Sequence, residues 1–324
     1  MSKIRDAILG YAIGDAFGLP FEGVEREKLI NNPVTEMYGD GSQPVDAGTF
    51  SANTSMSIAT MDAIIKAREL DYDELMKCLT DWIVNGKYTV TGEAIDLDKT
   101  TIKALTKYNE ALSNGIEINP LECGIEEEIY SNETLQRMIP IAFYSYFKKL
   151  NQEETLNIVK DVTHLTNKNE INVIGDFIYV NYLLNIIHGK DKYAAMNMLK
   201  SLNYDLFKEE YLSRFERILK GDINKLTLDD ISSNKDIVST LESVLWLVLK
   251  TENYSQSLIG AVSLGNDTDT IAALTGAITG IIYTYEDIPL KWKDKILKKD
   301  YLIEYCKEFE RILKISEDKK YEED

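Results

Sequence analysis

The spacing of apolar residues is the feature that most constrains how this chain folds. Apolar side chains recur every three and four positions across residues 135–150, 173–187, 237–249 and 301–315, the period of a helix with one buried face. Strand-like alternation is nearly absent, and the 324 residues include only 18 glycines and 6 prolines. The pattern predicts an all-α fold in which many helices are joined by short or medium loops.

We expect a compact multi-helix single domain over residues 1–315, because no repeat or low-complexity linker divides the chain. Residues 316–324 are strongly charged and predict a solvated C-terminal tail. Two stretches, 31–49 and 114–132, have the composition of long loops. Loops of this length inside a compact domain are often functional, so both are candidate parts of a site.

The charge balance limits the function classes. A formal net charge of −18 argues against general binding to nucleic acids or anionic membranes, since both need a basic surface. No run approaches the roughly 20 apolar residues of a membrane span, and the N-terminus lacks the cleavage site of a signal peptide. The three cysteines are far apart, as in proteins of a reducing compartment, so we expect a cytoplasmic protein. With two histidines, a multi-histidine zinc site is excluded.

Two carboxylates and two hydroxyls are crowded into four residues near the C-terminus. Asp267, Thr268, Asp269 and Thr270 precede a helical run rich in alanine and glycine, whose smooth face lets another helix come close. One capping side chain satisfies a helix start, so the second aspartate is surplus to that need. Carboxylate and hydroxyl oxygens are also the ligands that Mg²⁺ and Mn²⁺ prefer. From these residues alone, capping and metal binding are equal alternatives.

Two further polar segments adjoin predicted helices. Residues 48–56 end in a helix start at which Ser51, Asn53 and Thr54 are ordinary capping residues. Residues 10–22 contain glycines spaced by four, which suit a helix–helix contact, and end at Glu22 just after a proline. On its own, Glu22 is interpreted as a surface carboxylate.

Taken together, the three segments resemble the ADP-ribosylglycohydrolase family. Residues 14–22 are similar to its opening Gly-Asp-Ala-x-Gly-x-Pro-x-Glu stretch, 48–54 to its Gly-x-aromatic-Ser/Thr-Asp-Asp-Thr, and 265–270 to its Gly-Gly/Asn-Asp-Thr-Asp-Thr. Residues 131–140 resemble its Asn-Gly-x-x-x-Arg-x-x-Pro segment. The pairs Thr163-His164 and Ile288-Pro289, the latter with Trp292, also match. The resemblance covers about residues 4 to 295, and the joint pattern is specific.

The resemblance implies a compact all-α fold with two Mg²⁺ ions, or Mn²⁺ in their place, in a cleft that binds ADP-ribose. The reaction that it implies is release of ADP-ribose from an ADP-ribosylated protein or other modified target, by hydrolysis of the glycosidic bond at the distal ribose. By matched position, the implied metal ligands are Ser51, Asn53, Asp267, Asp269 and Thr270; the implied catalytic residues are Glu22 and Asp267; and the implied substrate-binding residues are Ser131, Asn132 and His164.

The chain departs from the family pattern at three places. Ala52-Asn53 stands where the family has Asp-Asp, so two negative charges are missing, and either an introduced inactivating change or natural variation explains this. Glu133 adds bulk and charge where a glycine is usual, and Asn234-Lys235 replaces a Gly-Tyr-like pair. The alternatives are therefore a non-catalytic module that binds ADP-ribose or a nucleotide, and a hydrolase of another ADP-ribosylated nucleotide or nucleobase.

Overall fold

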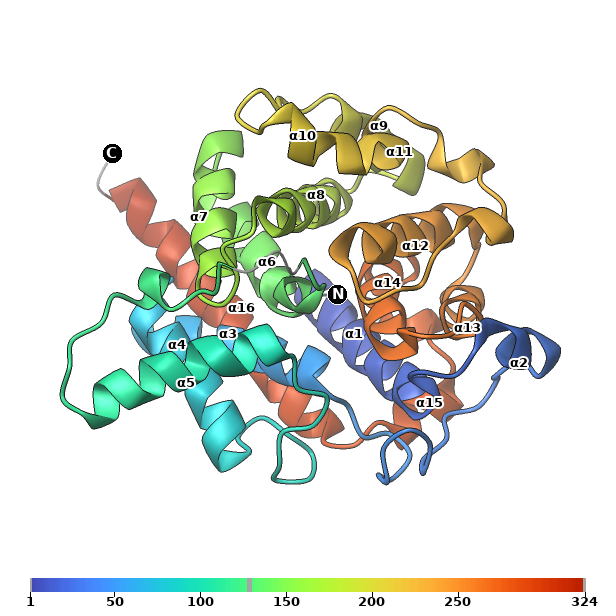
Figure 1. Ribbon diagram of the computed structural model, residues 1–324, viewed down its shortest axis with the longest axis horizontal. Helices are drawn as coiled ribbons and strands as arrows, with labels where there is room; N and C mark the ends of the chain where they lie inside the picture. The colour runs from blue at the N-terminus through green and yellow to red at the C-terminus, as the bar shows by residue number, and fades with distance from the viewer. Residues whose placement is uncertain (1, 127–129, 323–324) are drawn as a thin grey trace.

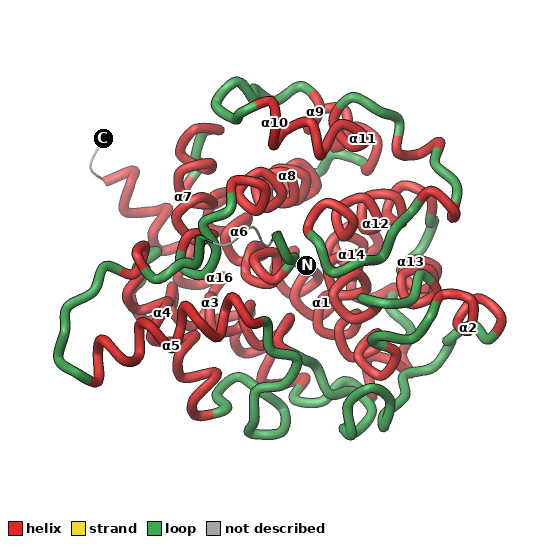
Figure 2. Tube along the Cα trace, viewed as in Figure 1, coloured by secondary structure: helices red, strands yellow, loops and turns green. Residues whose placement is uncertain are grey.

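Helices account for all of the regular secondary structure in the computed structural model, which describes residues 2–126 and 130–322 (Figures 1 and 2). Two isolated β-bridges, Ile125 with Asn167 and Ser131 with Asp236, are the extended pairings in these ranges. The predicted all-α fold is therefore confirmed.

The elements follow one another along the chain as α-helices with short 3₁₀ segments between them. The α-helices are α1 (Lys3–Gly18), α2 (Arg26–Asn31), α3 (Ala52–Ala67), α4 (Tyr72–Asn85), α5 (Lys99–Ser113), α6 (Met138–Lys148), α7 (Gln152–His164), α8 (Glu170–Ile187), α9 (Lys192–Lys200), α10 (Glu209–Leu212), α11 (Glu216–Leu219), α12 (Ile237–Lys250), α13 (Tyr254–Ser263), α14 (Thr268–Tyr283), α15 (Leu290–Lys295) and α16 (Lys299–Glu322). The 3₁₀ segments are η1 (Leu19–Phe21), η2 (Pro120–Glu122), η3 (Glu133–Arg137), η4 (Ser213–Phe215), η5 (Ile223–Lys225), η6 (Leu228–Asp230) and η7 (Tyr285–Asp287).

Three of the four helices predicted from apolar spacing are confirmed as α8, α12 and α16, but the helix predicted over 135–150 begins later, as α6 at Met138. Pro140 explains the difference. A proline cannot donate to the carbonyl four residues earlier, so it is tolerated only in the first turn of a helix. The carbonyl of Gln136, which an uninterrupted helix would leave without a donor, accepts a hydrogen bond from the Ser57 hydroxyl at 2.7 Å instead.

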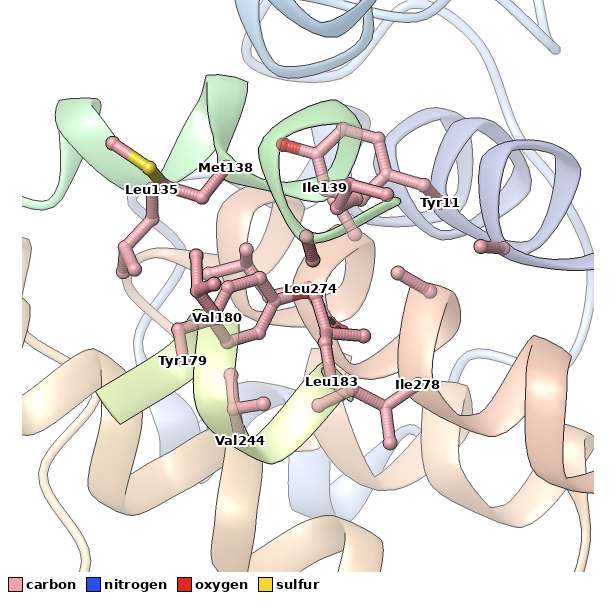
Figure 3. Packing of buried hydrophobic residues seen from close by; sticks show 14 of the residues in the cluster. Tyr11, Leu135, Met138, Ile139, Tyr179, Val180, Leu183, Val244, Leu274 and Ile278 are labelled. Carbon is pink, nitrogen blue, oxygen red and sulfur yellow. Dashed lines mark hydrogen bonds between the residues drawn. The ribbon is translucent and has the colours of Figure 1, made fainter. Parts of the chain in front are cut away.

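The most extensive helix pair joins α1 and α14, which lie at opposite ends of the sequence. Their backbones touch through glycines: a Cβ at Gly14 would lie 2.2 Å from the carbonyl oxygen of Ala272, and one at Gly276 would lie 2.4 Å from that of Gly10. The close helix contact expected from the small-residue spacing is therefore present. In Figure 3, α8 side chains such as Tyr179 and Leu183 face Leu274 and Ile278 of α14 across the core, which is a single cluster of buried apolar residues.

Long irregular segments border this core. The chain between α2 and α3 is irregular, as predicted for 31–49, and the predicted loop over 114–132 is interrupted by η2 and includes residues 127–129, which lie outside the described ranges. The backbone of α16 continues to Glu322, while the side chains of 316–324 are outside the description, so the tail stays a prediction. Within the described residues, no helix combines the length and apolar character needed to cross a membrane.

Candidate functional site

The N-termini of α3 and α14 open toward the same region, beside the end of α1. A cavity of about 280 Å³ lies there, which we call the acidic cavity. It is enclosed by the loop before α5, the start of η3 and Lys235. Four of the residues implied by the resemblance line it: Ser131, Asn132, Asp267 and Thr270. The acidic cavity is also lined by Asp96, Asp98, Glu133 and Lys235.

At the start of α14, the two aspartates are not used for capping. Asp267 occupies the N-cap position but makes no side-chain cap hydrogen bond, so the capping interpretation is wrong for it. Its Oδ2 accepts a hydrogen bond from the Asn132 amide instead. Asp267 and Asp269 are buried, and the Oδ1 atom of each has no hydrogen-bond partner among the described residues. Two buried carboxylate oxygens therefore remain available for a ligand.

Burial dominates the electrostatics of these aspartates. It raises the pKa of Asp267 to about 7, against the lowering effect of the nearby Lys235 charge. The pKa of Asp269 is raised well above its ordinary value by burial, and then by the negative charges of Asp96 and Asp267. A cation bound between these carboxylates would relieve both effects, because it restores favourable interactions for the ionised forms.

At the start of α3, the polar side chains are largely satisfied by one another. Ser51 is the N-cap: its Oγ accepts hydrogen bonds from the Asn53 backbone N–H at 3.3 Å and from the Asn53 side-chain amide at 3.0 Å. The same amide donates to Oδ2 of Asp269 at 3.1 Å. Asn53 Oδ1 is the exception, since it is buried and has no partner in the described structure. The capping interpretation of Ser51 is confirmed, and Ala52 contributes only a buried methyl group.

Sequence reasoning assigned no role to Asp15, which connects α1 to α3. Its Oδ2 accepts hydrogen bonds from the backbone N–H groups of Ser51 and Thr54, each at 3.0 Å, and from the Thr54 hydroxyl at 2.6 Å. Asp15 is fully buried, and burial raises its pKa to about 6 despite these donors. An aspartate between glycines in an otherwise apolar helix was the available signal, since such a position requires polar partners.

Glu22 lies beside α14 because its neighbours are hydrogen-bonded to the segment that precedes Asp267. Gly23 donates to the carbonyl of Asn266 at 2.7 Å, and Asn266 donates to that of Val24 at 2.9 Å. The Glu22 side chain is 14% exposed, so its interpretation as a surface carboxylate is wrong. Burial, and then repulsion from Asp96, raises the pKa of Glu22, while Lys235 opposes the shift.

Asp96 is the site residue that sequence reasoning missed altogether. It lies in the loop between α4 and α5 with a left-handed backbone (φ 54°), an uncommon conformation for a residue other than glycine. One carboxylate oxygen from each of Glu22, Asp96 and Asp269 lies within 4.8 Å of the other two. No local pattern around Asp96 marks it, because only the tertiary fold brings this loop to α14.

The remaining implied residues are divided between two places. Ser131 donates to the buried Glu133 carboxylate, which also accepts from Asn167 at 3.2 Å, and burial raises the pKa of Glu133 to about 8. His164 does not line the acidic cavity. It lines a second hollow of about 750 Å³, whose wall also includes Tyr130, Lys168, Lys208 and Arg214. Burial lowers the pKa of His164, which favours the neutral imidazole.

The donor set fits a divalent cation. Glu22, Asp96, Asp267 and Asp269 provide carboxylates, Thr270 adds a hydroxyl, and the Oδ1 atoms of Asp267 and Asp269 are buried without a partner among the described residues. On the α3 side, Ala52 has no donor atom, and the Asn53 amide nitrogen is directed to Asp269. The role of Ser51 as a ligand, implied by the resemblance, stays a prediction, since its hydroxyl already accepts two hydrogen bonds.

Comparisons with known proteins bear on this site and fold. The ADP-ribosylglycohydrolase family model matches residues 1–320. An ADP-ribosylarginine hydrolase from Serratia proteamaculans is 28% identical over 307 residues, which are 93% of this chain and 76% of that protein. An ADP-ribosyl-dinitrogen reductase glycohydrolase from Rhodospirillum rubrum is 23% identical over 292 residues, or 90% and 88% of the two chains.

A solved structure described as an ADP-ribosylglycohydrolase-related protein complex has the same fold. Its TM-score is 0.78 at 20% identity, and the match covers 96% of this chain and 98% of that one. The family model spans nearly the whole sequence, and the fold agrees over the same extent. The chain therefore belongs to the ADP-ribosylglycohydrolase family, whose members are glycosidase-type hydrolases.

Proposed function

We propose that this chain is a divalent-metal-dependent hydrolase that releases ADP-ribose from an ADP-ribosylated target by cleaving the glycosidic bond at the distal ribose. The observation that carries the proposal is the pair of buried aspartates at the start of α14. Asp267 makes no cap hydrogen bond, and Oδ1 of each aspartate has no partner among the described residues. The relatives named as ADP-ribosylarginine and ADP-ribosyl-dinitrogen reductase hydrolases support an ADP-ribosylated protein as the target.

Mg²⁺, or Mn²⁺ in its place, would be held by Asp267, Asp269 and Thr270, with Glu22 and Asp96 beside them. When bound, such an ion supplies a Lewis acid that orients ribose hydroxyls and lowers the pKa of a coordinated water. Asn132 keeps Asp267 in position through its amide hydrogen bond, and the Asn53 amide does the same for Asp269. These neutral donors leave the second oxygen of each carboxylate free.

Glu22 is the proposed general base. Its carboxylate is mostly buried but borders the carboxylate cluster, and its raised pKa brings it nearer to the pH at which a base both accepts and releases a proton. An Oε atom would take the proton of the water that attacks the anomeric carbon. Asp267, which lines the acidic cavity, would help to position the ion and through it the water.

The second hollow is the proposed place for the adenosine diphosphate part of the substrate. Tyr130 lines this hollow, and the next residue, Ser131, lines the acidic cavity, so the two spaces lie next to each other. Lys168, Lys208 and Arg214 provide positive charge suited to a pyrophosphate, while Glu126, which pairs with Lys168 at 3.3 Å, and Glu170 line the same hollow. The Arg214 guanidinium lies over the Tyr130 ring, 5.2 Å from its centroid. His164 and Asn132 would then contact different parts of one extended ligand.

Ala52 is proposed to weaken this activity, because it removes a carboxylate from the α3 side. The test is release of ADP-ribose from arginine-, serine- and nucleobase-linked substrates by the unsubstituted chain and by Ala52→Asp, with Mg²⁺. We expect release from at least one linkage, and tighter Mg²⁺ binding with roughly tenfold faster release for Ala52→Asp. Calorimetry that shows no gain in Mg²⁺ affinity contradicts the role of position 52.

The second candidate is a non-catalytic module that binds ADP-ribose. The observation that favours it is the start of α3, where Ala52 and Asn53 supply no carboxylate and Ser51 is used as a cap. If neither form releases ADP-ribose from any linkage, yet ADP-ribose raises the melting temperature, the binding module replaces the hydrolase.

A further inference from the structure

Lys235 pairs with two carboxylates that lie beside the proposed metal ligands. Its ammonium is paired with the Glu22 carboxylate, and its Nζ is 3.6 Å from Oδ1 of Asp96. Both acidic side chains are mostly buried, at 14% and 16% exposure, whereas the lysine side chain is 53% exposed. The ammonium therefore reaches the cluster from the solvent side.

The backbone at Lys235 is fixed on both sides. Its carbonyl accepts a hydrogen bond from the Asn132 N–H at 3.2 Å, next to the bridge between Ser131 and Asp236. Asp236 is the N-cap of α12 and accepts from the Ser239 N–H at 2.8 Å. The Cα position is thus held against the cavity wall, while the four-carbon stem remains free to move the ammonium.

A lysine ammonium and a divalent ion cannot both use the same carboxylate oxygens. A coordinated Mg²⁺ lies about 2.1 Å from its ligand oxygens, and Mn²⁺ prefers the same oxygen donors, so an ion bound to Asp269 beside Glu22 and Asp96 occupies the space of the Lys235 pairing. The lysine is half exposed, so it can leave to solvent with little loss of packing. The relation between the two cations is therefore competition and not permanent exclusion.

We propose that Lys235 is a tethered counter-ion that competes with divalent metal at the Glu22 and Asp96 carboxylates, each of which has an oxygen within 4.8 Å of one of Asp269. Its charge offsets the repulsion among these carboxylates, and a metal ion can bind there only when the ammonium moves into solvent. The inference rests on the metal site of the proposed function. It adds that the chain carries an internal substitute for a metal charge, so that its metal affinity is lower than its carboxylates alone would give.

The test is Mn²⁺ binding to the full chain, measured by calorimetry and by electron paramagnetic resonance of the free ion. Lys235→Met removes the charge and keeps a stem of similar size. Lys291→Met is the matched control, because it removes the same charge from a surface lysine that pairs with Glu36. Lys235→Arg keeps the charge at the site.

We expect Lys235→Met to lower the dissociation constant for Mn²⁺ about tenfold, and Lys291→Met to change it less than about twofold. Lys235→Arg should stay within about threefold of the natural sequence. In EDTA, Lys235→Met should melt at a lower temperature than Lys291→Met, and Mn²⁺ should remove the difference.

Equal Mn²⁺ affinities for Lys235→Met and Lys291→Met overturn the proposal, and so does equal tightening by Lys235→Met and Lys235→Arg. Absence of Mn²⁺ binding in every form overturns it as well. Hydrolysis is scored separately: tighter Mn²⁺ binding without ADP-ribose release from any substrate retains the counter-ion role and rejects the hydrolase. ADP-ribose release with a Mn²⁺ affinity that Lys235→Met leaves unchanged retains the hydrolase and rejects the counter-ion role.

Discussion

The N-termini of α3 and α14 approach the same site, and both begin with Asp or Asn and with hydroxyl side chains. The polar groups of the two helix starts are nevertheless bonded differently. At α3, Ser51 caps the helix, and Asp15 reaches over from α1 to bind two backbone amides. At α14, Asp267 makes no cap hydrogen bond, and two buried carboxylate oxygens are unpartnered among the described residues. Buried acceptors without a partner in the described structure occur at both starts, because Oδ1 of Asp15 and Oδ1 of Asn53 also lack one. The difference therefore lies in charge: α14 begins with two carboxylates of its own, whereas α3 begins with a neutral amide.

The largest expected effect is on the α14 side. Asp269→Asn should reduce ADP-ribose release roughly 1,000-fold and abolish detectable Mn²⁺ binding, because it removes a ligand charge without changing the shape of the side chain. Release kinetics and calorimetry measure this. Asp191→Asn, at the exposed cap of α9, is the control and should leave both unchanged. Release within tenfold of the natural sequence would show that Asp269 is not a ligand.

The next effect concerns stability at α3. Asp15→Ala should lower the free energy of unfolding by about 3 kcal/mol, because the buried N–H groups of Ser51 and Thr54 lose their acceptor. Urea denaturation in EDTA measures it. Asp191→Ala removes an exposed cap and should cost only about 1 kcal/mol. Equal losses for the two variants would contradict the cross-helix role of Asp15.

Buried acids at both helix starts should make stability depend on pH, and the α14 start should contribute more. Burial raises the pKa of Asp267 to about 7 and that of Asp269 well above its ordinary value, so the folded chain keeps protons that the unfolded chain has lost. The free energy of unfolding in EDTA should therefore fall as pH rises from about 4 through about 7, by about 1.4 kcal/mol per pH unit for each extra proton. Mn²⁺ should flatten this slope, and so should Asp269→Asn. Ser51→Ala should leave the slope in place, because the buried acid at the α3 start is Asp15, whose pKa is raised to about 6 by burial. A slope that Asp269→Asn does not reduce would assign it to other buried acids, such as Asp15 and Asp176.

The smallest effect is expected for Ser51→Ala. Loss of an N-cap hydroxyl should lower the free energy of unfolding by about 1 kcal/mol and change the Mn²⁺ dissociation constant less than about threefold. Thermal unfolding and calorimetry on the same samples separate the two quantities. A tenfold weaker Mn²⁺ affinity would instead make Ser51 a metal ligand and remove the contrast between the helix starts.

Most of the helical architecture could be predicted from apolar spacing, because burial of one helix face leaves a periodic signature in the sequence. The late start of α6 depends on Pro140, a local cue, together with the Ser57 hydroxyl, which only the fold brings to the Gln136 carbonyl. At the site, the crowding of Asp267 and Asp269 was visible as a surplus of carboxylates. The resemblance added Glu22, whose own surroundings in the sequence indicated a surface position.

Other parts of the site had no local signature. Asp96 comes from a loop that contacts α14 only in the folded chain, and its left-handed backbone is not encoded by a glycine. Lys235 was visible as a departure from the family pattern, but its pairing with Glu22 and Asp96 depends on three separate segments meeting. His164 and Asn132 were expected along one groove, and their assignment to two neighbouring spaces depends on how α7 packs.

The glycine-mediated contact between α1 and α14 has a consequence for how such a site changes over generations. The main chains of these two helices touch, so the relative positions of Asp15 and Asp269 are inherited with the glycines and not with the acidic residues themselves. Substitutions such as those at positions 52, 53 and 235 can then change the charge around the site while the framework persists. A side chain at Gly14 would instead push α1 and α14 apart and displace the site residues on both helices. The slowest-evolving positions of this site are therefore expected to be its glycines.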